Sequence, residues 1–265
     1  MKPLQVFPLP GIPEVKPGDD LAALLLQALQ RAGLKIEEGD ILALAQKIVS
    51  KAEGRYVRLA EVTPSPEARR IAERDGRDAR LVEVVLREAN EVVVASARAL
   101  IVEHRSGAVC AHGGVDRSNL AGGEEAVLLL PRDADASARA LRVALARAAG
   151  ARPAVLITDT QGRAFRRGVV GVAIGCAGVQ PVADLRGTRD RAGRPLEITQ
   201  VAQADELAAA ASAVMGQAAE GVPAVLIRGA RCRPGEEPAR TIFRPKAEDL
   251  FRPQSALEIG ARNSS

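Results

Sequence analysis

Three short runs of apolar residues constrain the fold of this chain more than any other feature of its sequence. They occupy positions 41–45, 154–158 and 222–227, and polar or glycine-containing segments bound each of them. A continuous apolar run of about four to eight residues between turn signals is typical of a strand buried on both faces. The three runs therefore predict the central strands of a sheet.

Segments with helical character lie among these strands but do not alternate regularly with them. Helices are expected at 21–32, 64–75 with Ser65 as the cap, 79–88, 134–149 and 205–215, and further strands at 3–8, 91–95, 99–103, 127–130 and 198–202. A doubly wound parallel sheet needs regular alternation of strand and helix. The order of elements favours a mixed α+β fold instead.

The chain length suits one large domain or two intimate subdomains. From about Arg231 the composition changes to arginine, proline and glutamate. Because such a segment buries little apolar surface, we expect residues 231–265 to form a loosely docked or disordered tail. Residues 1–230 are then the folded unit.

Charge and hydrophobicity exclude two classes of partner. The net charge is only +4, the basic residues are spread among acids, and aromatics make up 2% of the chain, so no nucleic-acid partner is expected. No apolar run approaches the roughly 20 residues of a membrane helix, and the N-terminus does not have the pattern of a signal peptide. The three isolated cysteines are typical of reduced thiols, so we expect a cytoplasmic protein.

The segment from Thr158 to Gly168 carries the clearest chemical signal. A buried strand is expected to deliver Asp159 to its carboxyl end, where α/β proteins tend to build sites. Hydroxyl residues flank this aspartate, and oxygen ligands are the ones that Mg2+ and Mn2+ prefer. Three arginines follow within nine residues and could bind phosphate or carboxylate groups. The alternative is that Asp159 caps a turn and the arginines form surface ion pairs.

Three other polar segments are candidates for ligand binding. The run 113–119 joins two glycines to an aspartate and an asparagine, the run 50–55 places Lys51 after a strand, and the run 215–221 ends a helix with a glycine turn. Their alternatives are an ordinary Asx turn, a solvated charge cluster and a helix C-cap. No P-loop, dinucleotide-binding glycine motif or nucleophile elbow is found in the sequence.

Four runs of the chain match, in order and spacing, those of a known family. They are SKAEGR (50–55), GGVDRSN (113–119), ITDTQGRAFRRGVVGVAIG (157–175) and DELAAAASAVMGQAAEGVPAVLIRG (205–229). With these runs the chain resembles the coenzyme F-420 γ-glutamyl ligases from about residue 4 to residue 230. Two positions depart from the family pattern, with Gln46 in place of the usual serine and His112 where asparagine is frequent.

The resemblance implies a reaction, its cofactors and an assembly. In that family GTP phosphorylates the terminal carboxylate of the coenzyme F-420 precursor, and the amine of L-glutamate displaces the phosphate to form an amide. Repetition adds further γ-linked glutamates. The implied cofactors are two Mg2+ or Mn2+ ions per site and K+. The implied architecture is a family-specific two-subdomain fold in an intertwined homodimer, with the site at the interface.

The resemblance also implies roles for individual residues. Asp116 and Asp159 are implied as ligands of one metal ion, and Thr160 and Gln217 as ligands of the second. The implied GTP site consists of Ile12, Pro13, Glu14, Val15, Gln46, Lys51, Asn119, Met215, Gly216, Gln217, Ala218, Ala219, Glu220, Gly221 and Val222. From their charge, Arg163, Arg166 and Arg167 are inferred to bind the anionic substrate. The expected catalytic residues are Asp116, Asp159 and Arg166.

Two alternatives to this function stay open. One is a different carboxylate–amine ligase on the same scaffold, with another acceptor or with ATP as the phosphate donor. The other is a nucleotide-binding relative without catalytic activity. The presence of both Asp116 and Asp159 disfavours the second alternative.

Overall fold

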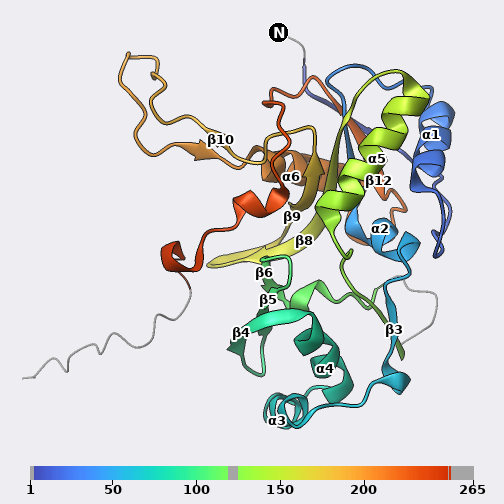
Figure 1. Ribbon diagram of the computed structural model, residues 1–265, viewed down its shortest axis with the longest axis vertical. Helices are drawn as coiled ribbons and strands as arrows, with labels where there is room; N and C mark the ends of the chain where they lie inside the picture. The colour runs from blue at the N-terminus through green and yellow to red at the C-terminus, as the bar shows by residue number, and fades with distance from the viewer. Residues whose placement is uncertain (1–2, 119–124, 250, 252–265) are drawn as a thin grey trace, which may run out of the picture.

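A five-stranded sheet forms the centre of the computed structural model, which describes residues 3–118, 125–249 and 251 (Figure 1). Its strand order is β1-β12-β2-β8-β9, and only the β2–β8 pair is parallel. The strands are β1 (Gln5–Pro8), β12 (Ala224–Arg228), β2 (Ile41–Ala45), β8 (Ala154–Arg163) and β9 (Arg166–Ala177). The three buried strands predicted from apolar runs lie side by side at positions two to four of this sheet.

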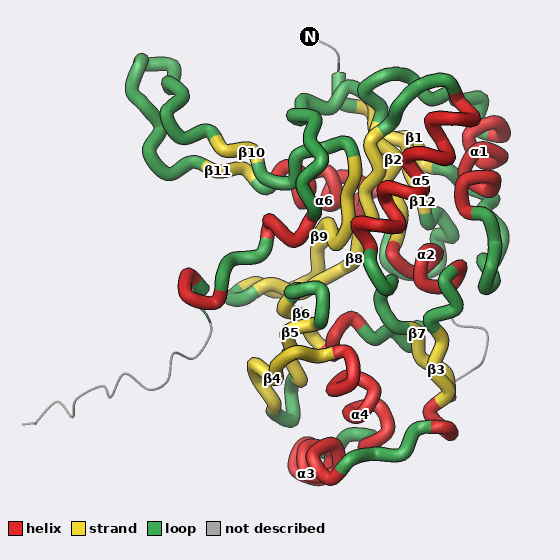
Figure 2. Tube along the Cα trace, in the orientation of Figure 1, coloured by secondary structure: helices red, strands yellow, loops and turns green. Residues whose placement is uncertain are grey.

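Helices cover both faces of this sheet (Figure 2). One face carries α1 (Leu21–Arg31), α2 (Gln46–Ala52) and α5 (Ala134–Ala149), and the other carries α6 (Gln203–Met215). The side chains of β2 alternate accordingly: Leu42 and Leu44 face α1 and α5, whereas Ile41 and Ala43 face α6. Because helices cover both faces of the sheet, side chains that point to either face are buried and apolar. The central strands are therefore continuous apolar runs and do not alternate between apolar and polar residues.

A second group of elements lies below the central sheet in Figure 1. It contains α3 (Pro66–Asp75), α4 (Ala79–Glu88) and the antiparallel strands β4 (Ala89–Ala95), β5 (Leu100–His104) and β6 (Val109–Ala111). The paired strands β3 (Tyr56–Arg58) and β7 (Ala126–Leu128) connect it to the upper group. The expected mixed α+β fold is confirmed. The remaining short elements are β10 (Ala183–Asp184), β11 (Gln200–Val201) and the 3-10 turns η1 (Leu59–Glu61), η2 (His112–Gly114), η4 (Ala239–Ile242) and η5 (Lys246–Glu248).

Helix ends follow the local sequence signals. The hydroxyl of Ser65 accepts a hydrogen bond from the amide of Ala68, as its predicted capping role requires, and Pro66 occupies the first turn. Asp133 caps α5 in the same way, and Gly150 ends that helix in the left-handed conformation. No helix among the described residues is both long and apolar enough to cross a membrane.

Several boundaries differ from the sequence-based expectations. Residues 46–52 form a helix, so Lys51 lies within α2 and not at a strand end. Strand β8 continues beyond Thr158 to Arg163, so Asp159 lies inside a strand and not at its end. The pairing of β8 with β9 holds this polar half extended, although nothing in its own composition requires it. The strand expected at 198–202 contains only the two residues of β11.

Helices approach strand β9 closely at two glycines. A Cβ atom on Gly171 would lie 2.5 Å from the carbonyl oxygen of Ala208 in α6, and one on Gly175 would lie 2.4 Å from the carbonyl carbon of Ala134 in α5. No larger residue fits either position. The two glycines therefore set the depth at which α5 and α6 pack against the sheet.

Strand β9 is an edge strand, and two carboxylates bind its free amide groups. Asp205 accepts from the amide of Ala173 at 2.9 Å, and Asp135 accepts from the amides of Cys176 and Ala239, both at 2.9 Å. Unpaired edge amides invite association with other strands. Asp135 thus accepts a hydrogen bond from an edge amide of β9 and, through the amide of Ala239, attaches the C-terminal segment to this edge.

The C-terminal segment packs against the central sheet around Ala239 and contacts β4 through Lys246, so the expectation of a loose tail is wrong for residues 231–249. Ala239 is fully buried, Gln203 accepts from the amide of Arg233 at 3.2 Å, and Arg142 pairs with Glu236 at 2.6 Å. Lys246 pairs with Glu91 at 2.6 Å. Residues 252–265 lie outside the part of the chain that the structure describes.

Asp135→Ala should weaken the attachment of this segment. The substitution leaves two amides without their acceptor, which costs about 1–3 kcal/mol in the free energy of unfolding, and trypsin should cleave after Arg240 or Lys246 sooner. Asp190→Ala is the matched control, because Asp190 also accepts from two amides, at 2.8 Å each, but in an exposed loop where water can replace it. Urea titration and timed proteolysis measure both effects. Equal losses in the two variants would contradict this role.

Candidate functional site

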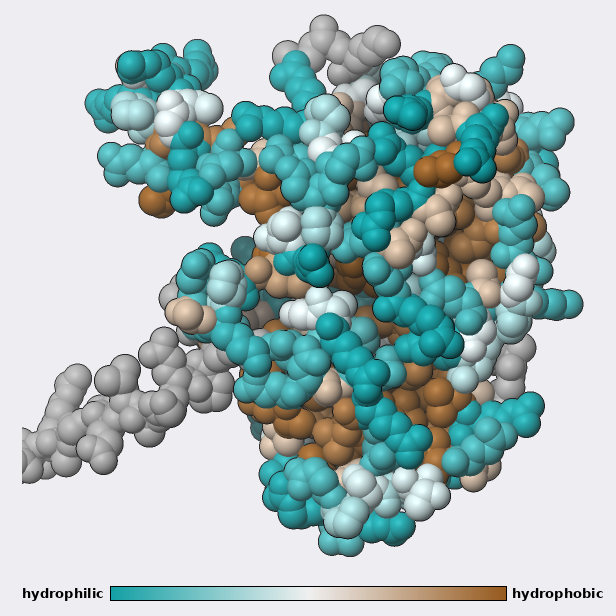
Figure 3. Space-filling view, viewed as in Figure 1, coloured by the Kyte–Doolittle hydropathy of each residue, from teal (hydrophilic) through white to brown (hydrophobic). Residues whose placement is uncertain are grey.

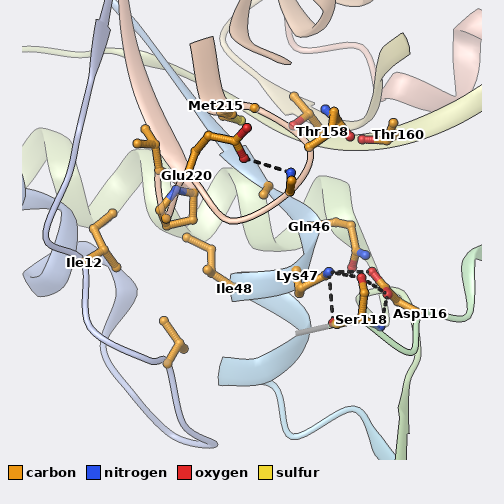
Figure 4. A pocket seen from close by; sticks show the side chains of 18 of the residues that line it. Ile12, Gln46, Lys47, Ile48, Asp116, Ser118, Thr158, Thr160, Met215 and Glu220 are labelled. Atoms are coloured by element: carbon orange, nitrogen blue, oxygen red, sulfur yellow. Dashed lines mark hydrogen bonds and ion pairs between the residues drawn. The ribbon is translucent and has the colours of Figure 1, made fainter. Parts of the chain in front are cut away.

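A cavity of about 630 Å³ lies where strand β8 becomes polar. Its wall is formed by the loop before α1, the start of α2, the segment after η2, the middle of β8 and the turn after α6. Figure 4 shows these side chains converging from segments that are far apart in the sequence. The lining residues are Ile12, Pro13, Glu14, Val15, Ala45, Gln46, Lys47, Ile48, Lys51, Asp116, Ser118, Thr158, Asp159, Thr160, Ser212, Met215, Gly216, Gln217, Ala218, Ala219, Glu220, Gly221, Val222 and Pro223.

The negative charge of Asp116 is balanced by a lysine, and a serine donates hydrogen bonds to its carboxylate. The Lys47 ammonium lies 2.8 Å from Oδ2 of Asp116, and the amide and hydroxyl of Ser118 donate to Oδ1 at 2.7 and 2.8 Å. Lys47 also donates to the Ser118 hydroxyl at 2.9 Å. Burial by itself raises the pKa of Asp116, but Lys47 and Ser118 outweigh it, and the pKa lies below its ordinary value. Asp116 is therefore an anion at neutral pH.

Asp159 has the opposite environment. Among the described residues no lysine or arginine forms an ion pair with it, and burial raises its pKa to about 6. The Thr160 amide and the Gln161 side chain, 3.4 Å from Oδ2, lower the pKa, whereas the charge of Asp116 raises it further. The charge of Lys47 also lowers the pKa of Asp159, but less than burial raises it, so the cavity has a half-buried carboxylate with too little positive charge around it. An added cation between the two carboxylates would relieve this deficit.

Helix α2 supplies polar groups from a buried position. Gln46, Ser50 and Lys51 are at most 4% exposed, and the Ser50 hydroxyl donates to Oε1 of Gln46 at 2.9 Å. Lys51 pairs with Glu14 of the loop before α1. Lys47 and Lys51 are one helical turn apart, so both ammonium groups lie on the side of α2 that faces the cavity.

The turn after α6 closes the cavity and depends on a glycine. Gly216 has a φ of +76°, and a Cβ atom there would lie 2.2 Å from Cδ of Glu220. The carboxylate of Glu220 accepts from the amide of Ala218 at 2.8 Å, and the side-chain amide of Gln217 donates to the Ser212 hydroxyl at 2.8 Å. Gln217 thereby keeps its side-chain oxygen available for a ligand.

Two threonines of β8 contribute differently to the cavity. Thr158 is 5% exposed and donates its hydroxyl to the carbonyl of Leu44 at 3.2 Å, which ties β8 to β2. Thr160 is half-buried, and its side chain lies along the wall (Figure 4). Together with the two carboxylates and Gln217, these groups form an oxygen-rich set of the kind that binds Mg2+ or Mn2+. No cluster of three or more His, Cys, Asp or Glu is found among the described residues.

The structure brings together nearly all of the residues that the sequence placed in the site. Every expected metal ligand lines the cavity, and so does every expected nucleotide-binding residue except Asn119, which lies outside the described residues. Arg166 does not line it. This residue is exposed at the start of β9, and Arg163 and Arg167 are exposed beside it.

The sequence analysis missed Lys47, Ser118 and Ser212. A helical pattern over residues 46–52 could have revealed Lys47, because Gln46 and Lys51 were already candidates and helical spacing places all three near one another. Ser118 and Ser212 carried no comparable signal. Their positions depend on contacts between segments that are distant in sequence.

The fold and the cavity define a mixed α/β protein with a polar, oxygen-rich cavity beside its central sheet. The chain belongs to the F420-0:Gamma-glutamyl ligase family, which it matches over residues 11–229. It is 50% identical over 253 residues to the coenzyme F420:L-glutamate ligase of Methanopyrus kandleri, covering 94% of this chain and 98% of that one.

Two further relatives carry the same name. The protein of Methanothermobacter thermautotrophicus is 50% identical over 247 residues, which is 91% of this chain and 96% of the relative. That of Archaeoglobus fulgidus is 43% identical over 249 residues, which is 94% of this chain and 96% of the relative. The resemblance seen in the four sequence runs is thereby confirmed at the level of the family.

Removing the charge of Asp159 should stabilise the protein above pH 6. Because its pKa in the folded state is above the unfolded value, Asp159 costs no stability below about pH 4, and the cost grows until about pH 6. Asp159→Asn should therefore raise the free energy of unfolding by about 1–3 kcal/mol at pH 7.5 and leave it unchanged at pH 4. Asp116→Asn should lower it at pH 7.5, since the pKa of Asp116 is depressed. Denaturant titrations of the wild type and both variants at pH 4 and pH 7.5 measure these free energies of unfolding. A lower free energy of unfolding for Asp159→Asn at pH 7.5 would contradict the raised pKa of Asp159.

Proposed function

We propose that this protein is a ligase that joins L-glutamate to a coenzyme F420 precursor through an amide bond. The observation that carries the proposal is the convergence of Asp116, Asp159, Thr160 and Gln217 with the 12–15 and 215–222 segments on one cavity. The names of the relatives support the substrates.

The reaction we propose proceeds through an acyl phosphate, with GTP as the phosphate donor. A carboxylate oxygen of the acceptor attacks the γ-phosphorus of GTP, and GDP leaves. The neutral amine of L-glutamate then attacks the activated carbonyl, inorganic phosphate leaves, and the amine loses a proton. In this proposal Lys51 and the turn after Gly216, both of which line the cavity, bind the phosphate groups. No base-reading residue distinguishes GTP from ATP, so the choice of GTP rests on the resemblance.

Divalent cations fit the oxygen groups of the cavity. We propose that Asp116 and Asp159 hold one Mg2+ or Mn2+ ion and that Thr160 and Gln217 hold a second, with K+ as an additional cation. When bound, such ions neutralise the phosphate oxygens during transfer. The raised pKa of Asp159 supports this assignment, because the carboxylate needs a positive charge nearby to ionise fully at neutral pH.

Lys47 should compete with the metal ion for Asp116. Its ammonium occupies the position beside Oδ2 that an incoming cation needs. Lys47→Met should therefore bind Mn2+ about tenfold more tightly in the absence of nucleotide, which corresponds to about 1.4 kcal/mol. Electron paramagnetic resonance of free Mn2+ measures this affinity directly.

Two variants control this measurement. Lys35→Met removes an exposed lysine that does not line the cavity and should leave the affinity unchanged. Asp159→Asn should abolish most Mn2+ binding, together with the rise in melting temperature that Mn2+ and GTP cause. An unchanged or weaker affinity in Lys47→Met would contradict the competition, and full Mn2+ binding by Asp159→Asn would contradict the metal assignment itself.

We further propose a homodimer of two-subdomain chains. The hairpin of β8 and β9 extends from the body and exposes apolar side chains, with Phe165 91% and Val169 57% exposed. Figure 3 shows another apolar area over β4 and α4, where Val92 and Val94 are exposed. A second subunit would cover such surfaces. It could also bring the arginines of this hairpin, Arg166 included, to the cavity of its partner.

One experiment tests the proposed function. The purified chain is incubated with coenzyme F420 precursor, GTP, Mn2+ and L-glutamate, and product masses are recorded. We expect products heavier by one or more glutamyl units and a molar mass near twice 27.8 kDa by light scattering of the same active sample. Equal or faster turnover with ATP would contradict GTP as the donor. Absence of product would favour the alternative, a ligase with another acceptor on the same scaffold.

A further inference from the structure

A second cleft lies along the edge strand β9 of the central sheet and reaches the start of α5. It consists of two adjoining cavities of about 580 and 550 Å³ that share Ser106, Ile174, Arg240 and Phe243 as lining residues. Its walls are the turn between β5 and β6, the segment leading into α5, the edge of β9 and the C-terminal segment. In Figure 1 the C-terminal segment and the β5–β6 turn approach the same end of α5.

Four arginines from four different segments line the 550 Å³ part of this cleft. They are Arg105 after β5, Arg132 before α5, Arg139 in α5 and Arg240 in η4. All four are exposed, and within the described part of the chain their guanidinium groups have no hydrogen bond and no ion pair. By contrast, Arg142 of the same helix pairs with Glu236.

The acidic residues of this part of the cleft are already engaged. Oδ1 of Asp133 accepts from the amide of Ala136 at 2.8 Å, and Oδ1 of Asp135 accepts from the amides of Cys176 and Ala239. Their charges offset only half of the four guanidinium charges. The floor of the cleft consists of the buried apolar residues Leu130, Pro131 and Ile174. Because these walls exclude water, the arginine charges attract an anion in the cleft more strongly than they would on an open surface.

The cleft begins beside the candidate active site. Gln161 lines its 580 Å³ part and donates a hydrogen bond to Asp159 at 3.4 Å. Val172, directly opposite Asp159 in the β8–β9 pairing, lines the same part. A ligand whose reacting end lies at Asp159 can thus continue past Gln161 toward Arg240 and the other arginines.

We propose that this cleft binds the anionic γ-glutamyl chain that the acceptor carries after the first addition. This inference rests on the proposed function. Each γ-glutamyl addition converts one carboxylate into an amide and brings two new carboxylates, so the acceptor gains one negative charge per cycle. The terminal γ-carboxylate lies in the active-site cavity, and the free α-carboxylates of earlier units lie along the arginines. Guanidinium groups bind carboxylates through paired hydrogen bonds.

The test uses tri-γ-glutamate, a peptide of three γ-linked glutamates, as the probe. Calorimetric titration of the full chain should show binding that weakens at least fivefold in the double variant Arg132→Ser/Arg139→Ser. Arg147→Ser/Arg152→Ser is the matched control. The guanidinium groups of these two arginines also have no hydrogen bond or ion pair within the described residues, but they lie in the last turn of α5 and just after it, and they line neither cavity. The control should bind the peptide like the wild type.

Product analysis provides the second readout. In the ligase assay the ratio of third to second glutamate addition should fall at least fivefold in Arg132→Ser/Arg139→Ser and stay unchanged in the control, because the third addition is the first whose acceptor carries an earlier glutamyl unit. Equal peptide affinity in all three proteins, or an unchanged ratio, overturns the inference. If the wild type binds the peptide through these arginines but adds no glutamate to the precursor, the proposed function fails while the polyanion site stands.

Discussion

The structure depends on one strand that serves two environments. The first half of β8 is apolar and buried between α5 and α6, and its second half is polar and lines the cavity. Its parallel pairing with β2 fixes the first half, and its antiparallel pairing with β9 carries the second half out of the core without a turn. Asp159 is therefore held in a paired strand, just beyond a register shift between Ile157 and Thr158, and not in a flexible loop. Such a backbone can hold a half-buried carboxylate in place despite the cost of its partial burial.

The balance of charge in the cavity follows from this placement. Asp116 comes from the lower group of elements, and Lys47 comes from the helix that follows β2. Their ion pair therefore joins the upper and lower groups next to Asp159, whose raised pKa shows that the positive charge nearby does not balance its own charge. A site of this kind is incomplete in electrostatic terms until a cation enters, and it stays attractive to cations because its backbone cannot relax around the deficit.

The edge strand β9 connects this site with the rest of the molecule. Two carboxylates occupy its free amides, and one of them also attaches the C-terminal segment, so the segment covers the edge without forming a strand. The same arrangement leaves a cleft between the segment, α5 and the β5–β6 turn. The C-terminal segment thus both protects the sheet edge and forms a cleft lined by arginines beside the candidate functional site.

The sequence alone determined the central strands, most helices and nearly all polar groups of the site. These features are encoded locally, by apolar runs, by capping residues such as Ser65 and by the four family runs. Only the tertiary structure decided that Lys47 neutralises Asp116, that β8 continues past Thr158 and that residues 231–249 pack against the sheet. It also placed Arg166 on an exposed hairpin outside the cavity. The physical reason is the same in each case, because these features depend on pairings between segments far apart in the chain, and no local pattern records the partner.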